Sequence, residues 1–190
     1  MKLVKSIIFI FVVLVIQSEC LAGDYPEVVS KFLKSMSEAY TEHSFVKSYD
    51  DILNSTNFVW KKQIVLKAKK PFTNRYGQKV YQRLYFSFYW YGDGSSCAEA
   101  FSKFLDCFGA ACVKLERGRD IEAMETIPTF VVFARGRIAI VRTHCEHLRD
   151  AYDEVKRKLK QMMGNYSIQT MDAGCGGPII WDVMRKEERL

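Results

Sequence analysis

Two segments in which apolar and polar residues alternate constrain the fold of this chain more than any other feature. In residues 58–68 and again in residues 80–90, apolar side chains occupy nearly every second position. This pattern is typical of strands that bury one face and leave the other face wetter. The intervening residues, 69–79, include Asn74 and Gly77, which favour a loop. The sequence therefore predicts a long antiparallel hairpin.

Further elements follow from helical spacing, caps and apolar runs. Ser96 and Thr143 are each followed three residues later by a glutamate, the pattern of an N-terminal helix cap. The expected elements are an opening helix over 26–41, helices after Ser96 and Thr143, and strands over 129–134 and 137–142. We therefore expect an α+β fold: a four- to five-stranded, mainly antiparallel sheet with helices packed on it.

The start of the chain has the layout of a secretory signal peptide. Two early lysines precede an unbroken apolar run, residues 7–16, and small residues follow. The run is too short to span a bilayer as a helix. We expect cleavage after Ala22 or Gly23. A lipid anchor on Cys20 is disfavoured because the large, charged Glu19 precedes it.

The expected organisation is a signal peptide over 1–22 and one globular domain over 23–190, with a partly flexible tail over 166–190. The mature chain contains no second long apolar run, so we expect a secreted or periplasmic protein without a transmembrane segment. The formal net charge is +6. We interpret the basic clusters at 61–62, 67–70 and the last helix as solvated faces, and expect no nucleic-acid partner.

The cysteines of the mature chain are odd in number, and outside the cytoplasm thiols tend to oxidise in pairs. Cys107 and Cys112 lie five residues apart across a predicted helix end, where a reversing chain can bring them within disulfide distance. Cys97 and Cys145 lie near predicted helix N-termini, which favour a thiolate. They are candidates for a second disulfide, a functional thiol pair or inert thiols.

A metal site is a further alternative for the segment around Cys145. His144 and His147 are three residues apart on one predicted helix face, with Cys145 between them. Imidazole and thiolate are preferred ligands of zinc, although a single His-x-x-His also fits a structural role.

The segment from Thr126 to Phe133 resembles the cis-proline strand of thioredoxin-like proteins, and the likeness extends over residues 83–163. The resemblance implies an α/β fold as the alternative architecture, with Pro128 as the cis-proline and Cys97 as the second cysteine of the redox motif. Gly94 stands where the first motif cysteine would be, so the resemblance does not imply ordinary dithiol exchange.

A candidate binding surface comes from Tyr81, Tyr85 and Tyr89, which share one strand face with Arg83. Aromatic side chains with a polar tip favour partner surfaces. The alternative is that the first helix covers this stripe.

No catalytic triad order, carboxylate pair, phosphate-binding loop or established metal motif is evident in the sequence. We therefore expect an exported binding or interaction module that is not an enzyme, is stabilised by disulfides and holds no cofactor. Its partner would be a protein or a small molecule. The alternatives are a thiol redox protein that uses Cys97 with Cys145, and a metal-binding protein.

Overall fold

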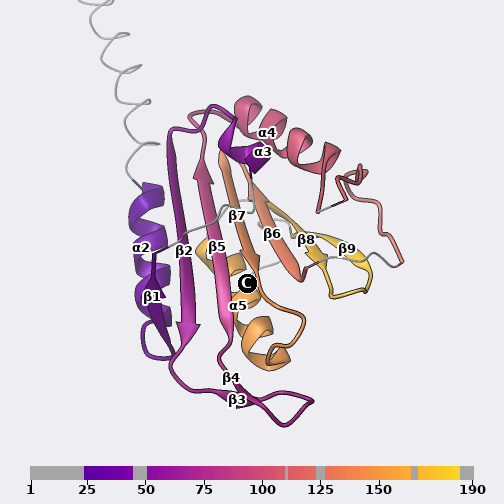
Figure 1. The fold of residues 1–190 in the computed structure, drawn as a ribbon. Helices are drawn as coiled ribbons and strands as arrows, with labels where there is room; N and C mark the ends of the chain where they lie inside the picture. Colours follow the sequence, from indigo (N-terminus) through magenta and orange to yellow (C-terminus); the bar gives the residue numbers. More distant parts are fainter. Residues whose placement is uncertain (1–23, 45–50, 110, 123–126, 164–166, 185–190) are drawn as a thin grey trace, which may run out of the picture.

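The structure, a computed structural model, describes residues 24–44, 51–109, 111–122, 127–163 and 167–184 (Figure 1). The expected signal peptide, its cleavage site and Cys20 lie outside these residues. The described residues form an α+β fold built on one large antiparallel sheet. Within these ranges, no helix is both long enough and apolar enough to cross a membrane.

The sheet has seven strands in the order β1-β2-β5-β7-β6-β8-β9, and each neighbouring pair is antiparallel. Its strands are β1 (Tyr40–His43), β2 (Trp60–Ala68), β5 (Arg83–Trp90), β6 (Thr129–Ala134), β7 (Arg137–Arg142), β8 (Ile168–Ala173) and β9 (Ile179–Met184). A separate small hairpin pairs β3 (Phe72–Thr73) with β4 (Lys79–Val80).

The two hairpins expected from the sequence are present. β2 and β5 pair along their length, with Ile64 opposite Phe86. β6 and β7 pair around a tight turn at Gly136, whose φ of 75° suits glycine. Alternation correctly identified β2 and β5, because every second residue of each packs into the core of the back face. β6 and β7 are buried on both faces, as their apolar runs predicted.

The expectation of four or five strands is wrong, because both ends of the domain add strands. Near the start, β1 pairs with β2. In the C-terminal segment, β8 pairs with β6 along its whole length and β9 pairs with β8. Ile168, Met171 and Ala173 of β8 are buried, so apolar burial holds this part of the segment in the sheet.

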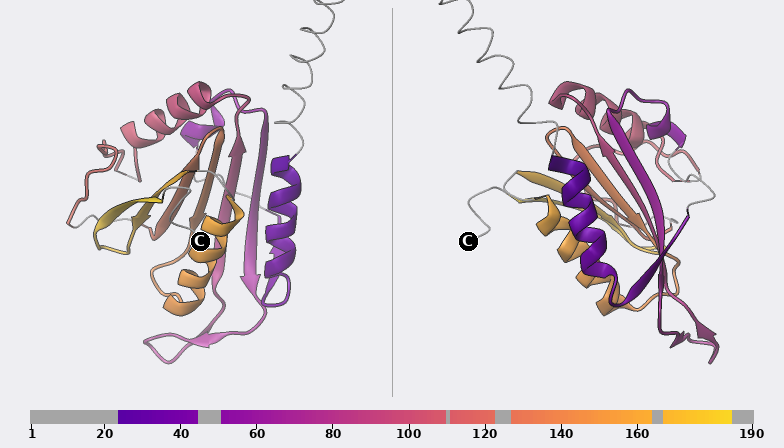
Figure 2. Two further views of the ribbon diagram at one scale, coloured as in Figure 1. Left: turned by 180° about the vertical axis from the view of Figure 1, so that it is seen from behind. Right: turned by 90° about the vertical axis from the view of Figure 1, so that its left-hand side faces the viewer.

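Helices cover the two faces of the sheet unequally (Figure 2). The back face is covered by α2 (Asp24–Met36) and α5 (Arg149–Met162), which bury apolar residues such as Phe86 and Phe88 of β5. The front face carries the short α3 (Asp51–Asn54) and α4 (Gly94–Asp106), which pack near the Trp90 end of β5. We call this end of the sheet the α4 end.

Both expected helix caps are wrong by a few residues. The N-cap of α4 is Asp93, whose side-chain Oδ1 accepts a hydrogen bond from the Ser96 amide at 2.7 Å. A carboxylate at this position satisfies the orphan amide as well as a serine would. α5 begins only at Arg149, and the Thr143 hydroxyl donates to the Arg83 carbonyl oxygen at 3.0 Å instead of capping a helix.

Candidate functional site

The cysteines form two disulfides and leave one thiol. Cys107 pairs with Cys112, as expected, with 4.0 Å between their Cα atoms. Cys145 pairs with Cys175, and Cys97 is free and buried. Of the alternatives for Cys97 and Cys145, a disulfide between the two is therefore wrong. The two disulfides indicate an oxidising environment outside the cytoplasm.

Cys145 meets Cys175 because of the strand order. Arg142, Thr129 and Ala173 lie in register across β7, β6 and β8, so the chain leaves β7 and β8 at the same end of the sheet. The segments that follow those strands carry the two cysteines, with 5.3 Å between their Cα atoms.

The free thiol of Cys97 is poorly placed for redox chemistry. Its side chain lies on the buried face of the first turn of α4 and is 0 % exposed, and its Sγ lies 3.7 Å from the carbonyl oxygen of Ala134. Burial raises the pKa of the Cys97 thiol to about 12. At neutral pH the group is therefore a protonated, enclosed thiol, the form that does not attack disulfides.

The structure does not assemble the expected metal ligands. Cys145 is in a disulfide, so its sulfur is not a thiolate. The His144 Nε2 lies 3.2 Å from the Tyr85 hydroxyl, while His147 Nδ1 lies 2.9 Å from the carbonyl oxygen of His144. In the described part of the chain, no group of three or more His, Cys, Asp or Glu side chains could hold a metal ion.

Pro128 is buried just before β6, but its peptide bond is not cis, because the described residues contain no cis peptide bond. The expectation of a cis-proline at this position is wrong.

The tyrosine stripe of β5 is divided between core and surface. Tyr89 is 0 % exposed among the side chains under α3 and α4, and its hydroxyl donates to Asn54 Oδ1 at 3.1 Å. Tyr85 is half-buried, and Tyr81 is 46 % exposed. The opening helix α2 lies on the back face, so it does not cover the stripe. Tyr89 is thus not part of a binding surface, whereas Tyr81, Arg83 and Tyr85 remain candidates.

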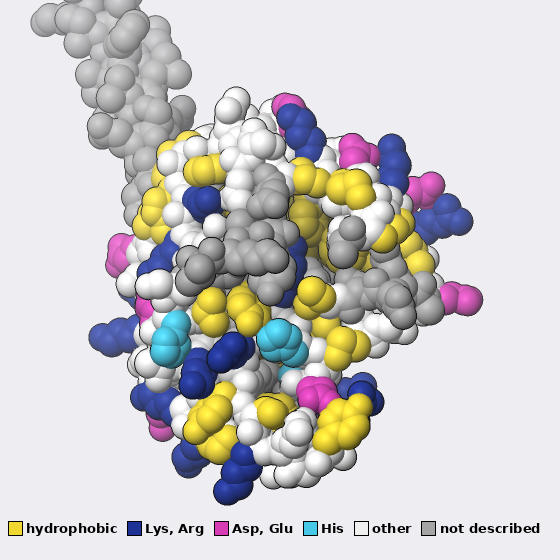
Figure 3. Space-filling model, viewed as in Figure 1, with side chains coloured by type: hydrophobic (Ala, Val, Ile, Leu, Met, Phe, Trp, Pro, Cys, Tyr) yellow, Lys and Arg dark blue, Asp and Glu magenta, His cyan; other side chains and the backbone are white. Residues whose placement is uncertain are grey.

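The front face of the described strands carries basic residues and no carboxylate. Register places His43, Val65, Tyr85 and Arg142 in one row across β1, β2, β5 and β7. The next row pairs Lys67 with Arg83. The carboxylates within the sheet, Glu42, Asp172 and Asp182, alternate onto the back face. A space-filling view shows basic and histidine side chains gathered on this side of the molecule (Figure 3).

The basic character continues into residues 69–82, which include β3 and β4 and which we call the arm. The arm extends past the end of the sheet opposite the α4 end, and we call this the arm end (Figure 1). Eight of the 28 Lys and Arg residues of the chain lie in residues 52–92, and none of the 22 Asp and Glu residues do. The other 20 basic and 22 acidic residues give the rest of the chain a formal charge of −2.

Six of these eight cations have no carboxylate partner among the described residues. Two of the six, Lys61 and Lys69, donate instead to Asn54 Oδ1 and to the Ser37 carbonyl oxygen. The other four are Lys67, Lys70, Lys79 and Arg83. The ammonium of Lys67 lies 4.5 Å from the centre of the Tyr81 ring, a cation–π contact. With Tyr76, which is 66 % exposed, and Tyr81, these four residues make up what we call the basic surface.

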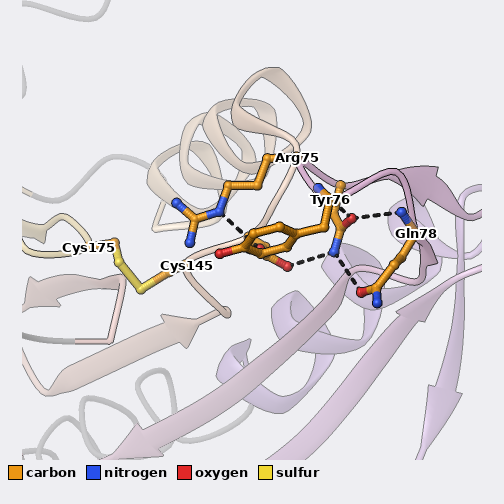
Figure 4. Close-up of polar contacts among 7 residues, drawn as sticks. Arg75, Tyr76, Gln78, Cys145 and Cys175 are labelled. Atoms are coloured by element: carbon orange, nitrogen blue, oxygen red, sulfur yellow. Dashed lines mark hydrogen bonds and ion pairs between the residues drawn. A yellow bond between two sulfur atoms is a disulfide. The ribbon is translucent and has the colours of Figure 1, made fainter.

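The turn of the arm is held by a single buried asparagine (Figure 4). Asn74 Oδ1 accepts hydrogen bonds from the backbone amides of Tyr76 at 3.0 Å and Gln78 at 2.9 Å. Its Nδ2 donates to Gln78 Oε1 at 3.3 Å and to Glu146 Oε2 at 3.0 Å. All the hydrogen-bonding capacity of the amide group is directed at fixing the turn.

Glu146 connects the arm to the body of the protein. Besides the bond from Asn74, its Oε1 lies 3.4 Å from Arg75 Nε. Its neighbour Cys145 is tied to Cys175, so the disulfide anchors the segment on which the arm rests (Figure 4). The turn of the arm is therefore held in a fixed geometry against the body of the protein.

Comparison of the chain with protein-family models, with curated proteins and with solved structures found no match.

Sequence reasoning missed the arm, although a signal for it was present. The stretch 52–92 combines eight cations with no acidic residue, whereas an ordinary solvated surface mixes charges of both signs. The contact between Asn74 and Glu146 joins residues 72 positions apart, so no local sequence pattern could predict it.

Proposed function

We propose that this protein is an exported binding module, not an enzyme, stabilised by its two disulfides, and that the basic surface holds an anionic partner. The observation that carries the proposal is the segregation of charge. The basic surface gathers Lys67, Lys70, Lys79 and Arg83 without a carboxylate partner in the described residues, on a chain that is otherwise slightly acidic. Like charges held together repel one another, and an anion bound there relieves that repulsion.

The mixture of residue types supports a binding role. Tyr81 and Tyr85 offer rings with polar tips beside Arg83, a combination enriched in interfaces. The thiol chemistry needed for the redox alternative has little support, because Cys97 is enclosed and protonated and the other four described cysteines are in disulfides.

The test is titration of the mature, disulfide-intact protein with dextran sulfate, a soluble polyanion, in an isothermal titration calorimeter at low ionic strength. We expect Lys67→Gln/Arg83→Gln to weaken binding about tenfold, the loss of two modest surface ion pairs. Raising the salt to 0.5 M should abolish most of the binding, because exposed charges are then screened within a few ångströms.

The matched control is Lys103→Gln/Arg135→Gln, which removes the same charge at the α4 end of the sheet. Its affinity should stay within twofold of the unmodified protein. Equal loss in the two double variants would mean that only net charge matters, and the proposal would then be wrong. No binding by the unmodified protein would also overturn it.

A further inference from the structure

We propose that the anionic partner is a lipid bilayer, and that the arm docks the protein on its anionic headgroups. This inference rests on the proposed function, because it requires the basic surface to be the binding surface.

The first step is the charge of the arm itself. Residues 69–82 contain Lys69, Lys70, Arg75 and Lys79 and no acidic residue. Lys67 and Arg83 flank the arm at its base as paired neighbours of β2 and β5. Basic residues gathered next to a membrane are attracted by the negative surface potential of anionic lipids.

The shape of the arm also bears on the kind of partner it can contact. The arm projects beyond the end of the sheet, as two views at right angles agree (Figure 1, Figure 2). Lys70, Tyr76 and Lys79 are exposed on this projection. A projecting element can touch a broad surface with several side chains at once. The form of the arm thus favours an extended surface as the partner.

The third step is the exposed tyrosine next to the turn of the arm. Tyr76 is 66 % exposed, and the guanidinium of Arg75 lies 4.8 Å from the centre of its ring. Tyrosine is enriched at membrane interfaces, where its ring enters the headgroup region and its hydroxyl stays hydrated. Beside cations, such a ring suits the boundary between headgroups and acyl chains.

The fourth step is preorganisation. The four hydrogen bonds of Asn74 and the ion pair between Arg75 and Glu146 hold the turn before any partner arrives. Gly77, with a φ of 76°, closes this turn. Binding therefore requires little ordering of the arm, and more of the interaction remains available as affinity.

The experiment is co-sedimentation of the mature, disulfide-intact protein with sucrose-loaded vesicles at 0.1 M salt. One set is pure phosphatidylcholine, and in the other set about a third of the lipid is the anionic phosphatidylglycerol. We expect binding to the anionic vesicles and none to the neutral ones. Lys70→Gln/Lys79→Gln should lower the partition coefficient about 25-fold, from the usual contribution of each basic residue near an anionic surface.

Two more variants sharpen the result. Lys103→Gln/Arg135→Gln, with the same charge change at the α4 end, should stay within twofold of the unmodified protein. Tyr76→Ser should lower partitioning about fivefold by removing apolar ring surface from the interface. An unchanged Tyr76→Ser variant would contradict the insertion of this ring, and equal losses in both double variants would contradict docking through the arm.

The titration with dextran sulfate separates this inference from the proposed function. Binding to dextran sulfate without binding to anionic vesicles would overturn the membrane as partner and leave a soluble polyanion as the partner. Binding to neither would overturn both proposals.

Discussion

The two ends of the front face differ in how they are covered, although the same strands run through both. At the α4 end, Tyr89 of β5 is fully enclosed, together with Phe101 and Phe104 of the covering helix. At the arm end, Tyr81 continues the same line of side chains and is 46 % exposed. One row of tyrosines thus begins at the surface and ends in the core.

The difference comes from where α4 starts. Only three residues separate the end of β5 at Trp90 from the start of α4 at Gly94, so the helix must begin at that end of the sheet. Its 13 residues then cross the strands and do not run along them (Figure 1). On the front face, no helix of the described residues covers the arm end of β2 and β5, and the cations without a carboxylate partner gather there. A short connection therefore determines which part of the face is core and which part can bind.

The largest expected difference between the two ends is in how much their tyrosines stabilise the fold. Tyr89→Ala should lower the free energy of unfolding by about 3–5 kcal/mol, because it leaves a cavity under α4 and removes one of the two hydrogen bonds that Asn54 Oδ1 accepts. Tyr81→Ala should lower it by less than about 1 kcal/mol, since it removes only exposed surface and a cation–π contact with Lys67. Urea denaturation of the disulfide-intact proteins measures both. Similar losses in the two variants would mean that the ends are equally packed.

A second prediction compares the disulfides of the two ends. Cys107–Cys112 closes a loop just after α4, whereas Cys145–Cys175 ties two segments at the arm end over 30 residues. Chain entropy predicts that replacing the longer link with serines costs about 3.5 kcal/mol, and replacing the shorter link about 2 kcal/mol. Guanidinium unfolding of the two double-serine variants tests this order. The reverse order would show that α4 depends on its link more than the arm end depends on Cys145–Cys175.

Much of the fold was open to prediction, and the exceptions have physical causes. Strands β2, β5, β6 and β7 could be predicted from alternating or continuous apolar residues, because each strand buries one or both faces. Strands β8 and β9 were not predicted, because the glycine-rich stretch between them led us to expect a partly flexible tail over the whole C-terminal segment.

The site was harder to predict than the fold, because it depends on strand order. Cys145 can reach Cys175 only if β8 lies beside β6, which no local pattern reveals. In the same way, alternation assigned Tyr81 and Tyr89 to one face, but only the placement of α4 decides which of them is covered.

A third prediction tests the seal over the α4 end through Cys97. Because burial raises the pKa of this thiol from 9.0 to about 12, the folded state keeps the proton at pH values where the unfolded chain has lost it. The stabilising contribution is therefore complete below about pH 9 and falls by about 1.4 kcal/mol per pH unit as the pH rises towards 12. Unfolding measured from pH 8 to pH 10.5 should show a weaker decline in Cys97→Ala.

The comparison with Cys97→Ala isolates the thiol, because the tyrosines whose pKa values are also raised by burial, such as Tyr91, are present in both proteins. Ellman's reagent gives an independent reading at pH 8. For the mature protein, which lacks Cys20, we expect no reaction in the native state and one thiol per chain after denaturation. Fast reaction of the native protein would mean that α4 does not seal this end.

The smallest expected effect concerns the arm end, where the carboxylate of Glu146 ties the turn to the body of the protein. Glu146→Ala removes the partner of Asn74 Nδ2 and of Arg75, which should lower the free energy of unfolding by about 1 kcal/mol. A local measurement is more sensitive than the free energy of unfolding. Hydrogen exchange of the Tyr76 and Gln78 amides, which donate to Asn74, should speed up severalfold. Glu154→Ala is the control, because it removes an equal charge whose partners, such as Arg157, lie on exposed turns of α5. If Glu146→Ala left exchange in the arm as slow as Glu154→Ala does, the turn would be rigid without its contact to the body, and the Cys145–Cys175 disulfide would have no part in presenting the basic surface.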